Sequence, residues 1–321
     1  MKQTRKVKSQ TTKEAMTVSI ENKQETGSTK GKSKPNILVI GATGKVGGEV
    51  VRLLQQEEGI HVIAAVRHPD KASPFEEQGI ETRIVDLDDV NTLPAVLKGV
   101  DRALLLTGYS VDMLKQSKRF LDEAKRQEVD HIVHIGASGA PTAEVAHWGW
   151  HQMVEAYIEQ KGFRYTHLRP EAYMQNVTGP GYRWLNDDVI THYIGSATWS
   201  WVDCLDVAAM AAQALLKPET FDGKTIPLGY DSQTMDGVAA ILSRKLGRTI
   251  TAQADSPDHF YQAAVESGAD PAYMHCVYTQ FKLDSEGKIP GAGTVFNNFE
   301  ELVGRPPITW EAFAAREAEH I

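Results

Sequence analysis

The sequence predicts an α/β protein in which a doubly wound parallel sheet is followed by a smaller α/β domain. Three observations support this prediction. Short runs of β-branched apolar residues alternate with stretches of helical periodicity through the first half of the 321-residue chain. The first run is followed at once by three glycines and a helical stretch. The second half has no comparable glycine turn and carries aromatic residues in loop-like stretches.

The first strand, turn and helix predict a phosphate-binding site. Residues 36–40 form a short apolar run typical of a buried strand, and residues 49–55 carry an apolar stripe at helical spacing. Between them, Gly41 permits a tight reversal, Gly44 lets a diphosphate lie against the backbone, and Gly47 lets the helix pack closely on the strand. Free N–H groups at the helix N-terminus then face the anion. The residues expected to contact a dinucleotide here are Gly41, Thr43, Gly44, Lys45, Val46 and Gly47.

The end of the second strand predicts which dinucleotide is bound. This strand is expected at 61–66, and Arg67 follows it, with Lys71 close by. An acidic residue at this position bonds the ribose hydroxyls of NAD, whereas a basic residue suits the 2′-phosphate of NADP. Residues 64–67 contain no acid. The sequence therefore favours NADP(H) over NAD(H). The alternative is that Arg67 is a solvated residue at a strand end.

Three more strands are expected at 82–85, 103–106 and 131–136, with helices at 90–98 and 111–127 between them. This alternation predicts parallel strands with right-handed crossovers, and ligands in such sheets lie outside the carboxyl ends of the strands. An adenine ring would lie beside the end of the 82–85 strand. Besides the glycine turn, the residues expected at this edge are Arg67, Asp86, Leu87, Thr107, Gly108 and Ser138.

The rest of the chain is expected to continue the α/β pattern. Aromatic residues from Tyr173 to Trp201 suit a substrate lid over the crevice, and Asp203 and Asp206 suit a strand-to-helix corner. Beyond residue 252 the chain is expected to be mostly helical. We expect a substrate domain at 171–321, part of which returns to the sheet, after a dinucleotide-binding domain at 35–170.

Residues 1–34 form a basic tail. They carry nine Lys or Arg and three Glu, a charge of +6, which leaves −14 for the remainder. The tail has almost no apolar content, so we expect it to be disordered. The acidic remainder argues against a nucleic-acid-binding surface on the fold. No apolar run is long enough to span a membrane, and two distant cysteines indicate neither a disulfide nor a metal site, so we expect a cytoplasmic protein.

Four segments together carry a resemblance to a known family. They are GATGKVG at 41–47, residues 147–176 with their V-E, G-x-x-Y-T, L-R-P and closing Asn, WVDCLDVA at 201–208, and GRPPITWEAF at 304–313. From residue 36 to about 316 the chain resembles the NmrA-like family of atypical short-chain dehydrogenases. The resemblance implies a Rossmann domain, a smaller C-terminal domain and binding of NAD(P).

The resemblance does not imply one reaction. Family members include NADPH-dependent quinone and imine reductases, benzylic ether reductases, and redox sensors without turnover. We therefore expect an NADPH-dependent oxidoreductase that reduces a small organic carbonyl, quinone or imine. The alternative is a regulator that binds NADP(H) and passes its redox state to a protein partner. An isomerase or cyclase on the same fold is a third possibility.

The resemblance also supplies candidates for the chemistry. Family reductases often carry a lysine four residues before the glutamate of the V-E pair, and here that position holds His151. A histidine titrates near neutrality and could donate a proton as hydride arrives, or it could simply pack. Ser138 lies where classical members place their serine. Tyr173 and Asn176, after L-R-P, resemble substrate-side and nicotinamide-side positions, although capping of the loop would explain them equally well.

Two other patterns resemble functional motifs, a metal site and a catalytic pair, but we do not expect either function. His147, His151 and Glu155 share a helix face, but no further ligand pattern accompanies them, so no metal site is predicted. Tyr157 and Lys161 spell the Y-x-x-x-K of classical short-chain dehydrogenases. The family spacing from the serine points instead to the vicinity of His151, so we do not expect this pair to be catalytic.

Overall fold

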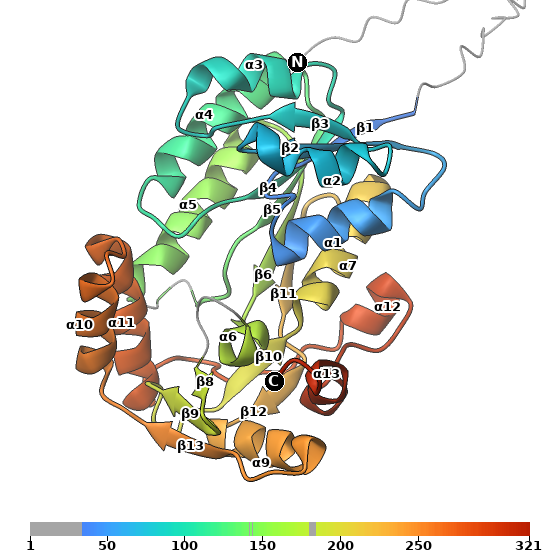
Figure 1. Cartoon of the computed structure of the whole chain (residues 1–321). Coiled ribbons are helices and arrows are strands. Elements are labelled where there is room, and N and C mark those ends of the chain that lie inside the picture. Colours follow the sequence, from blue (N-terminus) through green and yellow to red (C-terminus); the bar gives the residue numbers. More distant parts are fainter. Residues whose placement is uncertain (1–33, 141, 143, 180–183) are drawn as a thin grey trace, which may run out of the picture. The chain divides into compact units, whose positions relative to one another are not determined.

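The computed structural model describes residues 34–140, 142, 144–179 and 184–321. The tail expected at 1–34 therefore lies outside the described residues, apart from Lys34. Lys34–Ile321 form one compact unit, which Figure 1 shows. The division of this unit into two domains at residue 170 stays a prediction. None of the helices in the described part is both long and apolar enough to span a bilayer.

A parallel sheet of seven strands forms the centre of the unit and confirms the predicted fold class. Its strand order is β11-β6-β5-β4-β1-β2-β3 (Figure 1). The strands are β1 (Asn36–Val39), β2 (His61–Val66), β3 (Glu81–Ile84), β4 (Arg102–Leu106), β5 (His131–Ile135), β6 (Arg164–Pro170) and β11 (Lys224–Leu228). The winding direction reverses at β1, between β2 and β4. In such sheets the crevice at this reversal is where ligands bind.

Helices cover both faces of the sheet, because successive side chains of a strand point to opposite faces. On β1, Ile37 and Val39 join the core under α1 and α7, whereas Leu38 and Ile40 join the core under α3, α4 and α5. The helices against these two faces are α1 (Lys45–Leu54), α3 (Leu93–Leu97), α4 (Met113–Arg126), α5 (Ala146–Gln160) and α7 (Cys204–Leu216). Short helices α2 (Ser73–Glu76) and α8 (Pro218–Phe221) lie in the connections.

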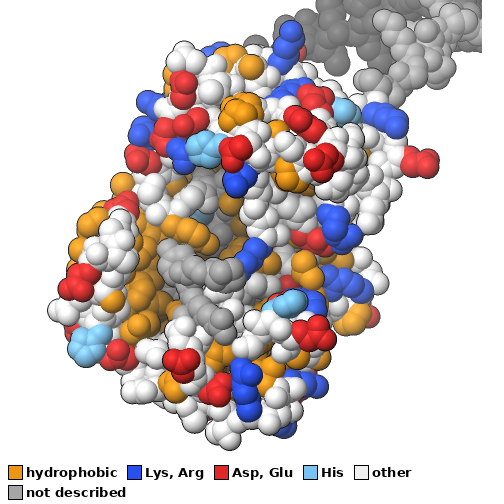
Figure 2. Space-filling view, viewed as in Figure 1, with side chains coloured by type: hydrophobic (Ala, Val, Ile, Leu, Met, Phe, Trp, Pro, Cys, Tyr) orange, Lys and Arg blue, Asp and Glu red, His pale blue; other side chains and the backbone are white. Residues whose placement is uncertain are grey.

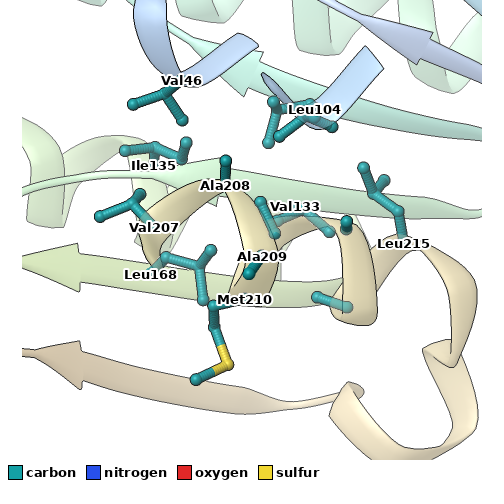
Figure 3. Packing of buried hydrophobic residues seen from close by; sticks show 14 of the residues in the cluster. Val46, Leu104, Val133, Ile135, Leu168, Val207, Ala208, Ala209, Met210 and Leu215 are labelled. Carbon is teal, nitrogen blue, oxygen red and sulfur yellow. The ribbon is translucent and has the colours of Figure 1, made fainter. Parts of the chain in front are cut away.

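Helix α7 carries five alanines, and this composition lets it lie close to the sheet and to α1. Figure 3 shows Ala208 and Ala209 of α7 beside Val133 of β5 and Leu168 of β6. All four side chains are buried. A larger residue on this face of α7 would have to displace the strands.

Two smaller sheets of three strands each build the lower part of the molecule in Figure 1, in the orders β12-β10-β7 and β13-β9-β8. Their strands are β7 (Ala172–Tyr173), β8 (Leu185–Asn186), β9 (Val189–His192), β10 (Trp199–Val202), β12 (Asp231–Gln233) and β13 (Thr251–Ala254). The accompanying helices are α6 (Gln175–Thr178), α9 (Met235–Leu246), α10 (Pro257–Glu266), α11 (Pro271–Ser285), α12 (Phe299–Val303) and α13 (Trp310–Glu317). Residues 286–298 connect α11 and α12 without helix or strand.

Asp203 and Asp206 connect α7 to the C-terminal segment. Asp203 is the N-cap of α7, because its Oδ1 accepts a hydrogen bond of 2.7 Å from the N–H of Leu205. Asp206 lies within the first turn of α7 rather than capping it. Its Oδ2 accepts a hydrogen bond of 2.6 Å from the N–H of Ile308, and its Oδ1 lies 2.8 Å from Nη2 of Arg305. The predicted corner thus also holds the chain that follows α12.

Candidate active site

A cavity of about 540 Å³ lies outside the carboxyl ends of the central strands. Its walls come from the loops that follow β1, β4, β5 and β6, and from β10, α5 and α11. Figure 2 shows hydrophobic side chains gathered over α10 and α11 on the face that Figure 1 presents. The cavity runs from the glycine turn to a chamber lined by aromatic side chains. The predicted dinucleotide site and the predicted substrate pocket are therefore parts of one cavity.

The glycine turn has the geometry that the sequence predicts. Gly41 has a φ of 74°, a backbone angle that favours glycine. A Cβ on Gly47 would lie 2.2 Å from the carbonyl oxygen of Gly41, so a larger residue there would break the turn. Gly44 is the N-cap of α1, and no side chain in the described part of the protein caps this helix. The N–H groups of its first turn therefore remain available to a diphosphate, and the turn fits a dinucleotide.

The structure brings most of the predicted cofactor residues to the cavity. Gly41, Gly44, Lys45, Val46, Gly47, Thr107, Gly108, Ser138 and Asn176 line it. The residues up to Ser138 follow β1, β4 and β5 and meet because parallel strands end at one edge, whereas Asn176 comes from α6. Thr43 is not among the lining residues.

Four further predicted residues, Arg67, Lys71, Asp86 and Leu87, do not line the cavity either. The ends of β2 and β3 nevertheless bring Arg67 and Asp86 together. Nη2 of Arg67 lies 3.2 Å from Oδ1 of Asp86 and 3.5 Å from Oδ2 of Asp88. The guanidinium is exposed, as is Lys71, which pairs with Asp70 at 3.8 Å. The nucleotide-binding role of these residues stays a prediction.

His151 lies on α5 at the wall of the cavity, next to a second buried histidine. Its Nδ1 is 3.4 Å from Nε2 of His134. Burial lowers the pKa of His151 to about 4. The imidazole is therefore neutral at pH 7 and can donate a hydrogen bond, but it does not supply the proton of an imidazolium. Sequence reasoning, which assumed a pKa near neutrality, missed this effect of burial.

Ser138 is joined to a carboxyl group that sequence reasoning missed. Its hydroxyl donates a hydrogen bond to Oε1 of Glu171, which also lines the cavity. Burial raises the pKa of Glu171, and the bond from Ser138 partly offsets this rise. Glu171 directly follows L-R-P at the end of β6. Because this position lies at the same edge of the sheet as Ser138, it could have identified Glu171 as a site residue from the sequence.

Tyr173 and Asn176 line the cavity at the start of the smaller sheets, with Tyr173 in β7 and Asn176 in α6. Burial raises the pKa of Tyr173 well above its ordinary value. The phenol therefore keeps its proton at neutral pH and can act as a hydrogen-bond donor.

An aromatic chamber forms the far end of the cavity. Its walls include Trp184, Trp199, Phe260 and Phe281. The ring centroids of Trp184 and Trp199 lie 5.8 Å apart, and those of Phe260 and Phe281 lie 4.8 Å apart. Sequence reasoning missed both phenylalanines, because only the packing of α10 and α11 brings them here.

Trp201, another aromatic residue of the predicted lid, was expected to help shape the pocket. It is fully buried behind Trp199 and does not line the cavity. Its ring packs on Trp310, with the centroids 5.2 Å apart. The pocket prediction is therefore wrong for Trp201, whose side chain is part of the core. Tyr182 lies outside the described residues.

The histidines and the glutamate that the structure brings close enough to share a metal ion are not the set considered from the sequence, which was His147, His151 and Glu155. Possible ligand atoms of His134, Glu155 and His167 lie within 4.8 Å of one another. Glu155, however, already binds Arg169 through both carboxylate oxygens, one of them at 2.9 Å from Nε. A metal ion would face that fixed guanidinium charge, so an ion pair surrounded by imidazoles describes the group better than a metal site.

Tyr157 and Lys161 do not line the cavity. The hydroxyl of Tyr157 donates a 2.6 Å hydrogen bond to Oδ1 of Asp122, and Nζ of Lys161 lies 2.5 Å from the same oxygen. Both side chains therefore join α5 to α4.

Known proteins resemble this chain along most of its length. NAD(P)H azoreductase of Xenophilus azovorans is 30% identical over 285 residues, which cover 88% of this chain and 98% of the relative. Quinone oxidoreductase 2 of Escherichia coli is 28% identical over 235 residues, covering 72% and 82%. Its structure with NADPH matches with a TM-score of 0.74 at 25% identity, covering 88% of this chain and 98% of that one.

A further solved structure is similar in fold and extent. Triphenylmethane reductase of Citrobacter sp., complexed with NADP(H), matches with a TM-score of 0.75 at 25% identity, covering 88% of this chain and 99% of that one. The sequence profile of the NmrA-like family matches residues 33–300. This match takes in the glycine turn, the sheet and the aromatic chamber. The chain therefore belongs to the NmrA-like family.

Proposed function

We propose that this protein is an NADPH-dependent reductase of a small organic carbonyl, quinone or imine. The observation that carries the proposal is the shared cavity. It joins the uncapped N-terminus of α1 to a chamber lined by aromatic side chains, a lining that suits a small organic molecule. A dinucleotide whose diphosphate lies at the glycine turn would extend along the strand ends toward that chamber.

The residues of the protein bind the dinucleotide and orient the substrate beside it. Amides of the first turn of α1 hold the diphosphate, and Thr107 and Ser138 flank the bound dinucleotide. The cofactor supplies a hydride. Tyr173 and the neutral His151 donate hydrogen bonds to the group being reduced, and Arg67 meets the 2′-phosphate at the end of β2.

The relatives support this proposal. The azoreductase is named for NAD(P)H, and the two similar solved reductases were crystallised with NADP(H) or NADPH. Both cysteines are free and buried, which suits our further proposal that the protein works in the reducing cytoplasm.

Calorimetric titration with NADPH and NADH tests the cofactor assignment. We expect tighter binding of NADPH, and we expect Arg67→Ala to remove most of that preference while leaving NADH affinity unchanged. Arg52→Ala is the matched control, because Arg52 is another exposed arginine in a carboxylate pair, on α1. Equal affinities of the unaltered protein for the two cofactors would contradict the role of Arg67.

Turnover is tested by following nicotinamide absorbance with quinone, enone and imine panels. Oxidation of NADPH that depends on one of these compounds is the expected result. Tight NADPH binding without any turnover would instead favour the redox-sensing regulator, which would need a protein partner.

A further inference from the structure

Asp284 is a buried acid at the wall of the aromatic chamber. It lies in the last turn of α11, lines the cavity and is only 3% exposed. The side chains of Trp199 and Gln280 bond to it. Its Oδ2, however, has no hydrogen-bond partner among the described residues. A buried carboxyl oxygen without a partner is costly, so this site is incomplete without a ligand.

The charges around the cavity are distributed unevenly. Its described charged lining residues are Lys45, Glu171 and Asp284. Lys45 belongs to the glycine turn, where a diphosphate would pair with it. His147 and His151 stay neutral at pH 7, since burial lowers their pKa values to about 3 and about 4. When they are ionised, these two carboxyl groups therefore make the rest of the cavity attractive to a cation.

The aromatic rings favour the same kind of ligand as the acids do. The centroids of Trp184 and Phe281 lie 5.9 Å apart, and those of Trp199 and Phe281 lie 6.1 Å apart. The negative face of an aromatic ring attracts a cation, most strongly where water is excluded. The C-terminal end of α11 adds the negative end of a helix dipole beside Asp284.

We propose that the substrate of this reductase is a flat organic cation, an iminium ion or a similarly delocalised carbocation, held against this aromatic wall with Asp284 as its counter-ion. The inference rests on the proposed reductase function and specifies its substrate class. The ionised carboxylate of Asp284 finds no hydrogen-bond donor in a neutral quinone or ketone, whereas a cation supplies the opposite charge.

The chemistry of such a substrate agrees with the site. A bound reduced nicotinamide would supply a hydride to the electrophilic carbon, forming a C–H bond, and would itself be oxidised. The π electron pair of the C=N bond moves to nitrogen, so the cation becomes a neutral amine. This step requires no proton from the protein, and a neutral His151 is therefore no obstacle.

Asp284→Asn tests the inference, because asparagine keeps the shape and removes the charge. The probes are an N-methylated dihydroisoquinolinium, which is a permanent cation, and menadione, which is neutral. We expect the unaltered protein to favour the cation. We expect Asp284→Asn to lower the ratio of kcat/KM for the cation to that for menadione by about 10- to 100-fold, mainly through KM of the cation.

Two controls separate this inference from the proposed function. Glu266→Gln removes an exposed acid on the neighbouring α10 and is expected to leave the ratio unchanged. NADPH affinity of each variant, measured by calorimetry, reports whether the fold and the glycine turn are intact. Failure to bind NADPH would overturn the proposed function itself.

Direct binding of the dihydroisoquinolinium to the complex with NADP⁺ gives a second readout that does not depend on turnover. We expect binding that weakens in Asp284→Asn. An unchanged ratio in that variant, or a cation that fails to bind the unaltered complex, would overturn the inference even if menadione were reduced.

Discussion

At the scale of single residues, the cavity is assembled at the ends of the central strands. Gly41, Thr107 and Ser138 are far apart in sequence, yet all line one cavity, because each follows a strand of the same parallel sheet. Asp284 and Phe281 could not be predicted in this way. Their helix reaches the cavity only through tertiary packing, and no local pattern in the sequence encodes that contact.

At Gly47, a single methyl group decides whether the turn can form. We expect Gly47→Ala to lower NADPH affinity by at least about 10-fold and stability by about 1–3 kcal/mol, because its Cβ would lie 2.2 Å from the carbonyl oxygen of Gly41. Calorimetry and urea denaturation measure the two effects. Gly59→Ala is the matched control, since nothing lies within 4 Å of a Cβ there. An NADPH affinity equal to that of the control would show that the turn does not hold the diphosphate.

Asp284 also predicts a pH dependence. Burial, with a smaller contribution from Glu171, raises its pKa to about 7, although bonds from Trp199 and Gln280 act in the opposite direction. The carboxylate that binds a cation therefore forms as pH rises through about 7, and affinity for the dihydroisoquinolinium should increase over that range. Glu171, whose pKa is also raised, faces the same cavity, while the histidines of α5 are already neutral.

Calorimetry of dihydroisoquinolinium binding to Asp284→Asn shows whether Asp284 causes this pH dependence. The range from pH 6 to pH 8 covers about one unit on each side of the midpoint. In the variant, affinity should depend less steeply on pH. A slope that persists would assign the titration to Glu171. For stability the sign is opposite: a raised pKa favours the folded state while the acid is protonated, and this contribution is lost as pH rises through about 7.

Elements with a continuous apolar run or an apolar helical stripe could be predicted from the sequence, whereas elements without one could not. Strands β1 to β5 and helices α1, α3 and α4 lie close to where these patterns place them. The β8–β9 pair escaped prediction, because neither β8 (Leu185–Asn186) nor β9 (Val189–His192) contains such a run. They are stabilised by pairing with β13 across a long separation in sequence, which no local window contains.

Helix α7 offers a test of packing at this scale. Ala208 is fully buried between α7 and the sheet, as Figure 3 shows. We expect Ala208→Leu to lower the free energy of unfolding by about 1–3 kcal/mol, because the added carbons have no space to fill. Ala263→Leu, on the exposed face of α10, should change it by less than about 0.5 kcal/mol. Equal urea midpoints for the two variants would contradict close packing of α7.

At the scale of the whole molecule, ion pairs attach the C-terminal segment to the start of α7. From the sequence, these two regions could be recognised only as family motifs. The segments WVDCLDVA and GRPPITWEAF lie about a hundred residues apart. The structure joins them, since Asp206 pairs with Arg305 at 2.8 Å, and Asp203 pairs at 2.7 Å with Arg316, three residues beyond the second segment. Both aspartates are fully buried, so each pair fixes the C-terminal segment to the corner that begins α7.

These contacts predict that removing the side chain of Asp206 lowers stability mainly in the C-terminal segment. Asp206→Ala would leave the N–H of Ile308 without its 2.6 Å acceptor and Arg305 without its partner. Because the side chain of Arg305 is 40% exposed, water would resolvate the guanidinium, and we expect a cost of about 1–3 kcal/mol rather than the larger cost of a fully buried pair. Hydrogen exchange should then accelerate at Ile308 and through α13 before it does so in β1 or β4, since local contacts set local opening. Glu319→Ala, at an exposed position near the C-terminus, serves as the control. Faster exchange spread evenly over the central sheet would instead mean that Asp206 supports the whole fold and not the closure of its C-terminal segment.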